Sequence, residues 1–204
     1  MRTGRWFAVS MTIVLITMPI AAQERGGQRG GAPAAVGPAM TLTIPAFPDG
    51  GQIPVKFSQA AEGAAPGEGT SPAISWANPP AGTQSFVLHM HDMDVVRNRT
   101  TDDQAHWVVW NIPASATGLP EGVPKGSQLQ DGSYQISATG PVYRGPGAPA
   151  NGPFHHYVFE LYALSANLDL PNTAGRAELL AAMEGKTVAK AAYVGRFRGT
   201  PPPQ

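Results

Sequence analysis

The segment "FVLHMHDMD", residues 86–94, ends an apolar run with two histidines and two aspartates. Side chains alternate between the faces of a strand, so Asp92 and Asp94 are expected on one face and His89 and His91 on the other. Carboxylates gathered at the end of a buried strand can orient a histidine or contribute to a cation site. A strand that simply ends in a solvated turn is the alternative. Other polar groups must converge on the same place to favour a site.

Two further apolar segments carry histidines near an end. His106 begins "HWVVWNIP", which is apolar on both faces, so its imidazole is costly to bury unless it is paired. In "PFHHYVFELYAL" the alternation places His155 and Tyr157 on one face and His156 and Glu160 on the other. A single histidine in either segment is more often structural than functional. Together with the aspartates, the two segments predict a polar site where several strands end.

A loop rich in glycine and proline, "YRGPGAPANGP" at residues 143–153, precedes the second of these segments. Its irregular backbone is expected to leave the N–H groups of Gly145, Gly147 and Ala148 free to face a concavity. Such a run of oriented amides suits an anion. A surface connection stiffened by proline is the alternative for this loop alone.

The elements that must position these residues are mostly strands. From Met40 to Val158, short apolar runs alternate with turn residues, which is typical of a mainly β protein. One segment, "AGRAELLAAMEG", has apolar residues at helical spacing and ends at Gly185, which can cap a helix. The segment "TVAKAAYVGRF" is then expected as a last strand. The sequence therefore predicts a mainly β fold with one helix near the C-terminus.

The composition excludes several classes of protein. The 204 residues contain 14 basic and 14 acidic side chains, so a strongly basic nucleic-acid-binding protein is excluded. The absence of cysteine excludes a disulfide framework, a thiol nucleophile, a lipid-modified cysteine and a zinc–thiolate site.

The N-terminal residues 1–22 have the composition of a secretory signal peptide. Arg2 and Arg5 precede an uncharged apolar stretch that ends in small residues. That stretch is shorter than the roughly 20 apolar residues that span a bilayer, so an anchor is the less favoured alternative. We expect a periplasmic or secreted protein with no stable membrane span in its mature form. Its predicted parts are a signal peptide (1–22), a flexible linker (23–40), one domain (41–198) and a disordered tail (199–204).

Several segments, in order, resemble the phosphatidylethanolamine-binding proteins, in their bacterial branch of Raf-kinase-inhibitor-like proteins. They are "SPAISWANPPAGTQSFVLHMHDMD", "HWVVWNIP", "YRGPGAP", "HHYVFELYAL" and "AMEGKTVAKAAYVGRF". The resemblance extends from about residue 41 to residue 198. It implies a β-sandwich around a large antiparallel sheet, with a small anion-binding pocket at one end.

The resemblance also implies which residues form that pocket. Met93 stands where the family's aspartate-proline-aspartate motif has proline, Ala148 replaces the first of two prolines, and His156 stands where arginine is common. These departures predict a looser pocket with a shifted preference. The implied ligand-binding residues are Asp92, Asp94, His106, Gly145, Pro146, Gly147, Ala148, His155 and Tyr157.

The function expected from these residues is binding rather than catalysis. Asp92 is expected to orient and charge His106 or His155, which would donate to a phosphate or phospholipid headgroup together with Tyr157 and the loop amides. Binding should then be strongest below about pH 7. No metal and no cofactor is expected. Two alternatives remain: an interaction protein that inhibits a protease, as the resemblance implies for some members, and a metal-dependent hydrolase that uses the carboxylates and histidines.

Overall fold

The structure, a computed structural model, describes residues 37–199. The predicted signal peptide, all but the last four residues of the predicted linker, and all but the first residue of the predicted tail lie outside the described residues. The first strand, β1, begins at Thr41, the residue at which the domain was predicted to start.

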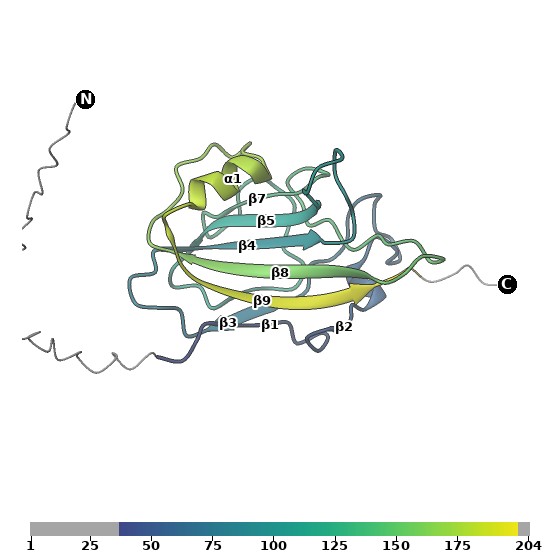
Figure 1. Cartoon of the computed structure of the whole chain (residues 1–204), viewed down its shortest axis with the longest axis horizontal. Helices are drawn as coiled ribbons and strands as arrows, with labels where there is room; N and C mark the ends of the chain where they lie inside the picture. Colours follow the sequence, from purple (N-terminus) through teal and green to yellow (C-terminus); the bar gives the residue numbers. More distant parts are fainter. Residues whose placement is uncertain (1–36, 200–204) are drawn as a thin grey trace, which may run out of the picture. The chain divides into compact units, whose positions relative to one another are not determined.

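The larger of two sheets has six strands in the order β2-β9-β8-β4-β5-β7 (Figure 1). Neighbouring strands are antiparallel except for the short parallel pair of β2 and β9. The four long strands occupy the centre of the sheet and the two short ones its edges. The bounds are β2 Gly51–Gln52, β9 Thr187–Phe197, β8 His155–Leu164, β4 Ser85–Asp92, β5 Gln104–Pro113 and β7 Tyr134–Ile136.

The smaller sheet has three strands in the order β1-β3-β6 and lies against one face of the larger sheet. A short 3-10 helix, η1, precedes β3, and the α-helix α1 lies between β8 and β9 in the chain. The prediction of a mainly β fold with a helix near the C-terminus is therefore confirmed. The bounds are β1 Thr41–Thr43, β3 Ile74–Ala77, β6 Gly118–Leu119, η1 Val55–Phe57 and α1 Arg176–Met183.

Two apolar cores cover the two faces of the larger sheet. All eight residues of β4 are buried, because this strand has long neighbours on both sides and packed layers on both faces. Phe86, Leu88 and Met90 face the core between the two sheets, whereas Val87 faces a second core that includes Leu179 of α1. The alternation predicted for this strand is therefore confirmed.

An irregularity in the pairing of β5 with β4 changes the direction of one side chain. Met90 pairs with Trp107 and His91 pairs with Ala105, so His106 is an extra residue on β5 with no partner across the ladder. Such a bulge bends the strand and re-aims the residue that it contains. The ring of His106 consequently meets that of Tyr157, at a centroid distance of 5.0 Å and an interplanar angle of 89°.

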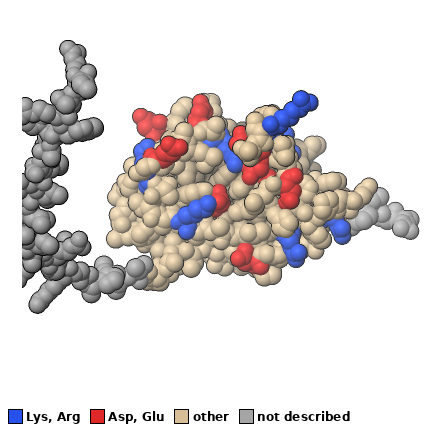
Figure 2. All heavy atoms as spheres, in the orientation of Figure 1, with Lys and Arg blue, Asp and Glu red and all other residues tan. Residues whose placement is uncertain are grey.

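Charges of both signs are scattered over the surface. Figure 2 shows no extended patch of one sign on the face that it draws. In the part of the chain that the structure describes, no helix has the length and the apolar character needed to cross a membrane.

The close approach of β9 to neighbouring apolar side chains gives a first prediction. A Cβ atom at Gly195, which pairs with Tyr157 of β8, would lie 2.5 Å from Ile53 and 2.8 Å from Phe47. We expect Gly195→Ala to lower the free energy of unfolding by about 1–3 kcal/mol, the usual cost of overpacking a core. Urea denaturation measures this change. Gly37→Ala, where a Cβ meets nothing within 4 Å, is the control; equal stabilities of the two variants would contradict the packing described here.

Candidate anion site

A surface pocket lies where β4, β5 and β8 meet the loop that precedes β8. It contains most of the residues that the sequence singled out and several that it did not. The lining residues are Gln59, Asp92, Val95, Arg97, Gln104, His106, Arg144, Gly147, Ala148, Pro149, His155 and Tyr157.

Asp92 is paired with His155. The distance from Asp92 Oδ2 to His155 Nδ1 is 2.7 Å, and the Asp92 side chain is almost fully buried. A carboxylate can only accept here, so Nδ1 of His155 carries a proton and its Nε2 remains for other partners. The second carboxylate oxygen, Oδ1, accepts from the backbone N–H of Asp94 at 3.0 Å. Of the two histidines expected to pair with Asp92, the structure therefore selects His155.

His106 has a different partner and a different charge. Its Nδ1 lies 3.0 Å from the carbonyl oxygen of Arg144, so Nδ1 must donate and Nε2 is left with a lone pair. Burial lowers the pKa of His106 from 6.5 to about 4, an effect that the backbone carbonyl and the charge of Asp92 only partly offset. Asp92 was expected to orient and charge His106 or His155, and the lowered pKa of His106 speaks against the first of these two alternatives. At neutral pH His106 offers an acceptor, not a donor.

Tyr157 is held in its protonated form. Burial, together with the negative charge of Asp92, raises the pKa of the Tyr157 hydroxyl well above its usual range. The backbone N–H of Gly147 donates to the Tyr157 oxygen at 3.2 Å, so this amide is not free as the sequence had suggested. The tyrosine oxygen accepts that bond, and its protonated O–H is a donor that has Asp92 as one nearby acceptor.

The positive charge of the pocket comes from arginines that the sequence analysis did not select. Arg97 and Arg144 both line the pocket. The Nε atom of Arg144 is buried and has no hydrogen-bond partner among the described residues. Buried donors are nearly always paired in native proteins, so an unpaired one beside a pocket marks a place for a ligand or a water. The position of Arg144 inside the glycine–proline loop was an available signal for it.

Three predicted site residues do not line the pocket. Asp94 is exposed, and its Oδ2 accepts from the backbone N–H of His156 at 2.6 Å. Gly145 packs against the end of η1, where a Cβ would meet the carbonyl oxygen of Phe57 at 2.8 Å. The carbonyl oxygen of Pro146 accepts from the backbone N–H of Gln59 at 2.9 Å. These residues shape the strand end and the loop, and they do not face a ligand.

Gln59 is the clearest residue that sequence reasoning missed. Its side-chain Nε2 donates to the carbonyl oxygen of Gly145 at 2.7 Å, across 86 positions of the chain. This bond fixes the glycine–proline loop against the segment after η1. No local pattern around Gln59 marks it, because its role depends on a contact between distant segments.

The pocket residues do not support the alternative of a metal-dependent hydrolase. A metal centre needs at least three ligand atoms that converge on one point. Within residues 37–199, the group of histidine and carboxylate side chains that meets this requirement is His89, His91 and Glu160, which contains no pocket residue.

Comparisons with known proteins point to one family. A sequence model of the phosphatidylethanolamine-binding protein family matches residues 43–198. The UPF0098 protein of Methanothermobacter thermautotrophicus is 38% identical over 161 residues, which are 78% of this chain and 99% of that protein.

Two solved structures are similar over most of the chain. CT736 from Chlamydia trachomatis is 31% identical, with a TM-score of 0.66, and the match covers 79% of this chain and 98% of that one. YbcL from E. coli, described as a new member of the mammalian PEBP family, is 25% identical with a TM-score of 0.68. That match covers 80% of this chain and 100% of YbcL.

The burial of His106 predicts how stability depends on pH. The unfolded histidine binds a proton below about pH 6.5, whereas the folded one binds it only below about pH 4. The unfolded state therefore holds more protons between these values, so the free energy of unfolding should fall as the pH drops through this range, by about 3 kcal/mol from His106.

NMR of the histidine ring protons measures the titration directly, and urea denaturation at several pH values measures its effect on stability. The exposed His156 is the internal reference, and a His106→Asn variant should lose this part of the pH dependence. A His106 midpoint near 6.5 would contradict the burial described here.

Proposed function

Because the chain belongs to the phosphatidylethanolamine-binding protein family, we propose that it is a non-enzymatic binding protein whose pocket takes a small phosphate-type anion. The family match and the solved relatives confirm the resemblance and the β-sandwich class inferred from the sequence. Free phosphate and the phosphate of a phospholipid headgroup offer the same chemistry to the pocket. The buried, unpartnered Nε of Arg144 is the observation that carries the proposal.

The charges of the pocket favour an anion. Arg97 and Arg144 are positive, His106 is neutral at pH 7, and Asp92 is the negative side chain among the lining residues. Both oxygens of Asp92 already accept hydrogen bonds, from His155 and from the backbone of Asp94. An anion therefore does not face bare carboxylate lone pairs. It faces a guanidinium donor and a tyrosine hydroxyl, and such charge-assisted bonds are among the stronger ones in proteins.

The acceptor on His106 adds a preference for a ligand that also carries a donor. A singly protonated phosphate monoester has one acidic O–H, and phosphoethanolamine has an ammonium group as well. Either donor can satisfy Nε2 of His106. Affinity for a phosphate monoester should then fall above about pH 6 because the ligand loses its proton, not because the pocket does. The sequence analysis predicted stronger binding below about pH 7 because of a charged histidine. The proposal keeps this direction but attributes it to the proton of the ligand.

Export remains part of the proposal and rests on the composition of residues 1–22.

The alternative of a protease-inhibitor-type interaction protein also stays open. Its supporting feature is the pair of exposed apolar side chains in the turn and loop after β4, Met93 and Val96, which are 60% and 72% exposed. Exposed apolar residues beside a pocket are compatible with a protein contact, but they do not identify the partner protein.

Calorimetric titration with inorganic phosphate and with phosphoethanolamine tests the anion pocket. We expect both to bind, and Arg144→Gln to weaken binding roughly 10- to 100-fold, because a charge-assisted hydrogen bond contributes about 1.5–3 kcal/mol. Arg198→Gln is the matched control, since this exposed arginine lies over the ring of Phe154 and does not line the pocket.

The two sources of the anion are separated by vesicles with and without phosphatidylethanolamine. Binding to these vesicles that depends on Arg144 would favour a lipid headgroup, and binding of soluble phosphates alone would favour a free anion. If the wild-type protein bound neither phosphate nor phosphoethanolamine, or if Arg144→Gln bound them as well as wild type, the anion pocket would be refuted.

Expression with the native N-terminus in a Gram-negative host tests export. We expect the mature protein in the periplasmic fraction, with an intact mass that corresponds to the loss of about the first 22 residues. A chain of full mass that stays with the inner membrane would contradict the predicted cleavage.

A further inference from the structure

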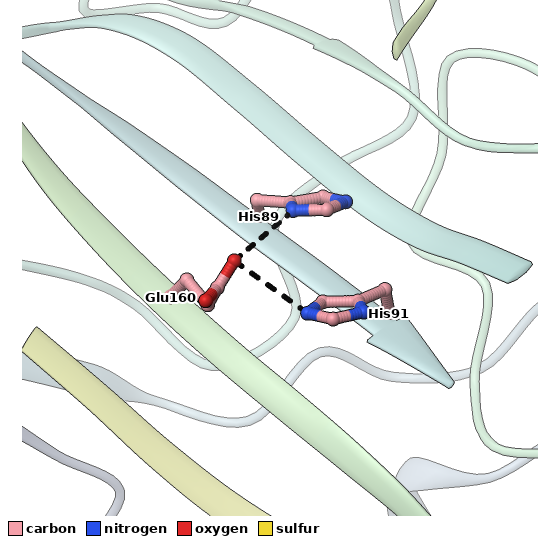
Figure 3. Close-up of side chains that lie close together, drawn as sticks. All are labelled: His89, His91 and Glu160. Carbon is pink, nitrogen blue, oxygen red and sulfur yellow. Dashed lines mark ion pairs between the residues drawn. The ribbon is translucent and has the colours of Figure 1, made fainter. Parts of the chain in front are cut away.

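A second polar cluster lies on the face of β4 opposite to the anion pocket. Figure 3 shows His89 and His91 side by side on β4, with the carboxylate of Glu160 on β8 directed between them. The two imidazoles are stacked, at a centroid distance of 4.6 Å and an interplanar angle of 5°. We propose that these three side chains form a binding site for one divalent transition-metal ion of the zinc class.

The strand pairing brings the three ligand atoms together. His89 pairs directly with Glu160 across the β4–β8 ladder, and His91 is two residues further along the same face. Oε2 of Glu160 lies 3.5 Å from Nδ1 of His89 and 3.5 Å from Nε2 of His91. Ligand atoms around a tetrahedral ion with bonds of about 2.0–2.1 Å are separated by about 3.4 Å. Two of the three separations therefore already match such a centre, and all three atoms lie within 4.8 Å of one another.

A carboxylate behind His91 fixes the orientation of its ring. Nδ1 of His91 lies 2.5 Å from Oδ2 of Asp103, so Nδ1 carries a proton and Nε2, which lies toward Glu160, is the nitrogen left for a metal ion. Asp103 is itself held by Arg176 of α1 at 2.8 Å. A carboxylate that binds the far nitrogen of a ligating histidine is the usual outer support of a metal site.

His89 supplies the second, independent observation. Its side chain is 2% exposed, and neither of its ring nitrogens has a hydrogen-bond partner in the described part of the chain. A buried imidazole without partners is costly and calls for an ion or a water that completes its contacts. Burial also lowers the pKa of His89, which keeps the ring neutral with a lone pair to offer.

A proton is the competing occupant. Burial opposes protonation of His91, but Glu160 and Asp103 outweigh it and hold the pKa of His91 above its usual value. A proton on Nε2 of His91 would bridge that ring to Glu160 and would leave His89 with only its 3.5 Å contact to the same carboxylate. A metal ion satisfies both rings and the carboxylate together, which is why the geometry favours it.

The other groups around Glu160 fix its carboxylate without occupying the site. Lys190 forms an ion pair with Oε1, and the hydroxyl of Tyr162 donates to Oε2 at 2.7 Å. A carboxylate oxygen has two lone pairs, so Oε2 keeps one for a metal ion. The side chains of His91 and Glu160 are 11% and 15% exposed, which leaves the cluster some access to solvent.

The ligand types define the class of metal. Two imidazoles and one carboxylate suit zinc, cobalt, nickel and copper, whereas magnesium and calcium prefer oxygen ligands throughout. Three protein ligands leave a fourth position for water. The site is separate from the anion pocket and does not depend on the proposed function.

The test is titration of the chelator-treated protein with zinc chloride in a calorimeter and with cobalt chloride in visible absorption. We expect one ion per chain, a tetrahedral cobalt spectrum and no response to magnesium. His89→Gln and Glu160→Gln should each weaken zinc binding at least 100-fold, and Asp103→Asn about 10- to 100-fold. His156→Gln is the matched control, because this exposed histidine pairs with Asp94 outside the cluster.

NMR of the histidine rings gives a readout that needs no variant. Zinc should shift the ring signals of His89 and His91 and leave that of His156 unchanged. Absence of zinc binding by the wild-type protein, unchanged affinity in His89→Gln, or zinc shifts confined to the other histidines would each overturn the proposal. A dispersed, native-like NMR spectrum of His89→Gln shows that loss of zinc binding is not loss of the fold.

Discussion

The complete burial of β4 is the constraint on which the rest of the structure depends. This strand carries His89, His91 and Asp92 into a region with almost no access to water, where every polar atom needs a partner from a neighbouring strand. Asp92 finds His155 on β8, and His91 finds Asp103 just before β5. Alternation along one strand thus directs adjacent residues to opposite faces, and each face acquires its own polar cluster inside an apolar sheet.

The bulge at His106 has a comparable effect on β5. By simple alternation this ring would share a face with Val108, which belongs to the core on the α1 side. The extra residue turns it toward Tyr157 instead, where its Nδ1 meets the carbonyl oxygen of Arg144. The same bond fixes the tautomer of the ring and anchors the first residues of the glycine–proline loop. One irregular pair in the ladder therefore decides both the position and the hydrogen-bonding character of this side chain.

Sequence patterns predicted the strands, the helix and six residues that line the pocket, namely Asp92, His106, Gly147, Ala148, His155 and Tyr157. These predictions succeeded because they depend on local periodicity and on recognisable segments. The charge of His106 could not be predicted, because it follows from burial by segments remote in the chain. Gln59 was missed for the same reason. The faces of His89, His91 and Glu160 were predicted correctly, but their convergence depends on the register between β4 and β8, which no single strand encodes.

The edges of the larger sheet have a consequence for how the protein behaves in a crowded solution. Its two outermost strands, β2 and β7, are two and three residues long, whereas the strands between them have 8 to 11 residues. A long open edge would offer a row of unpaired backbone groups to another chain. The two residues of β2 pair only with Gly195 and Arg196 of β9, so the outer side of residues 187–193 has no strand beside it in the described part of the chain. This stretch of β9 is therefore the part of the larger sheet that is open to pairing with a strand of another chain.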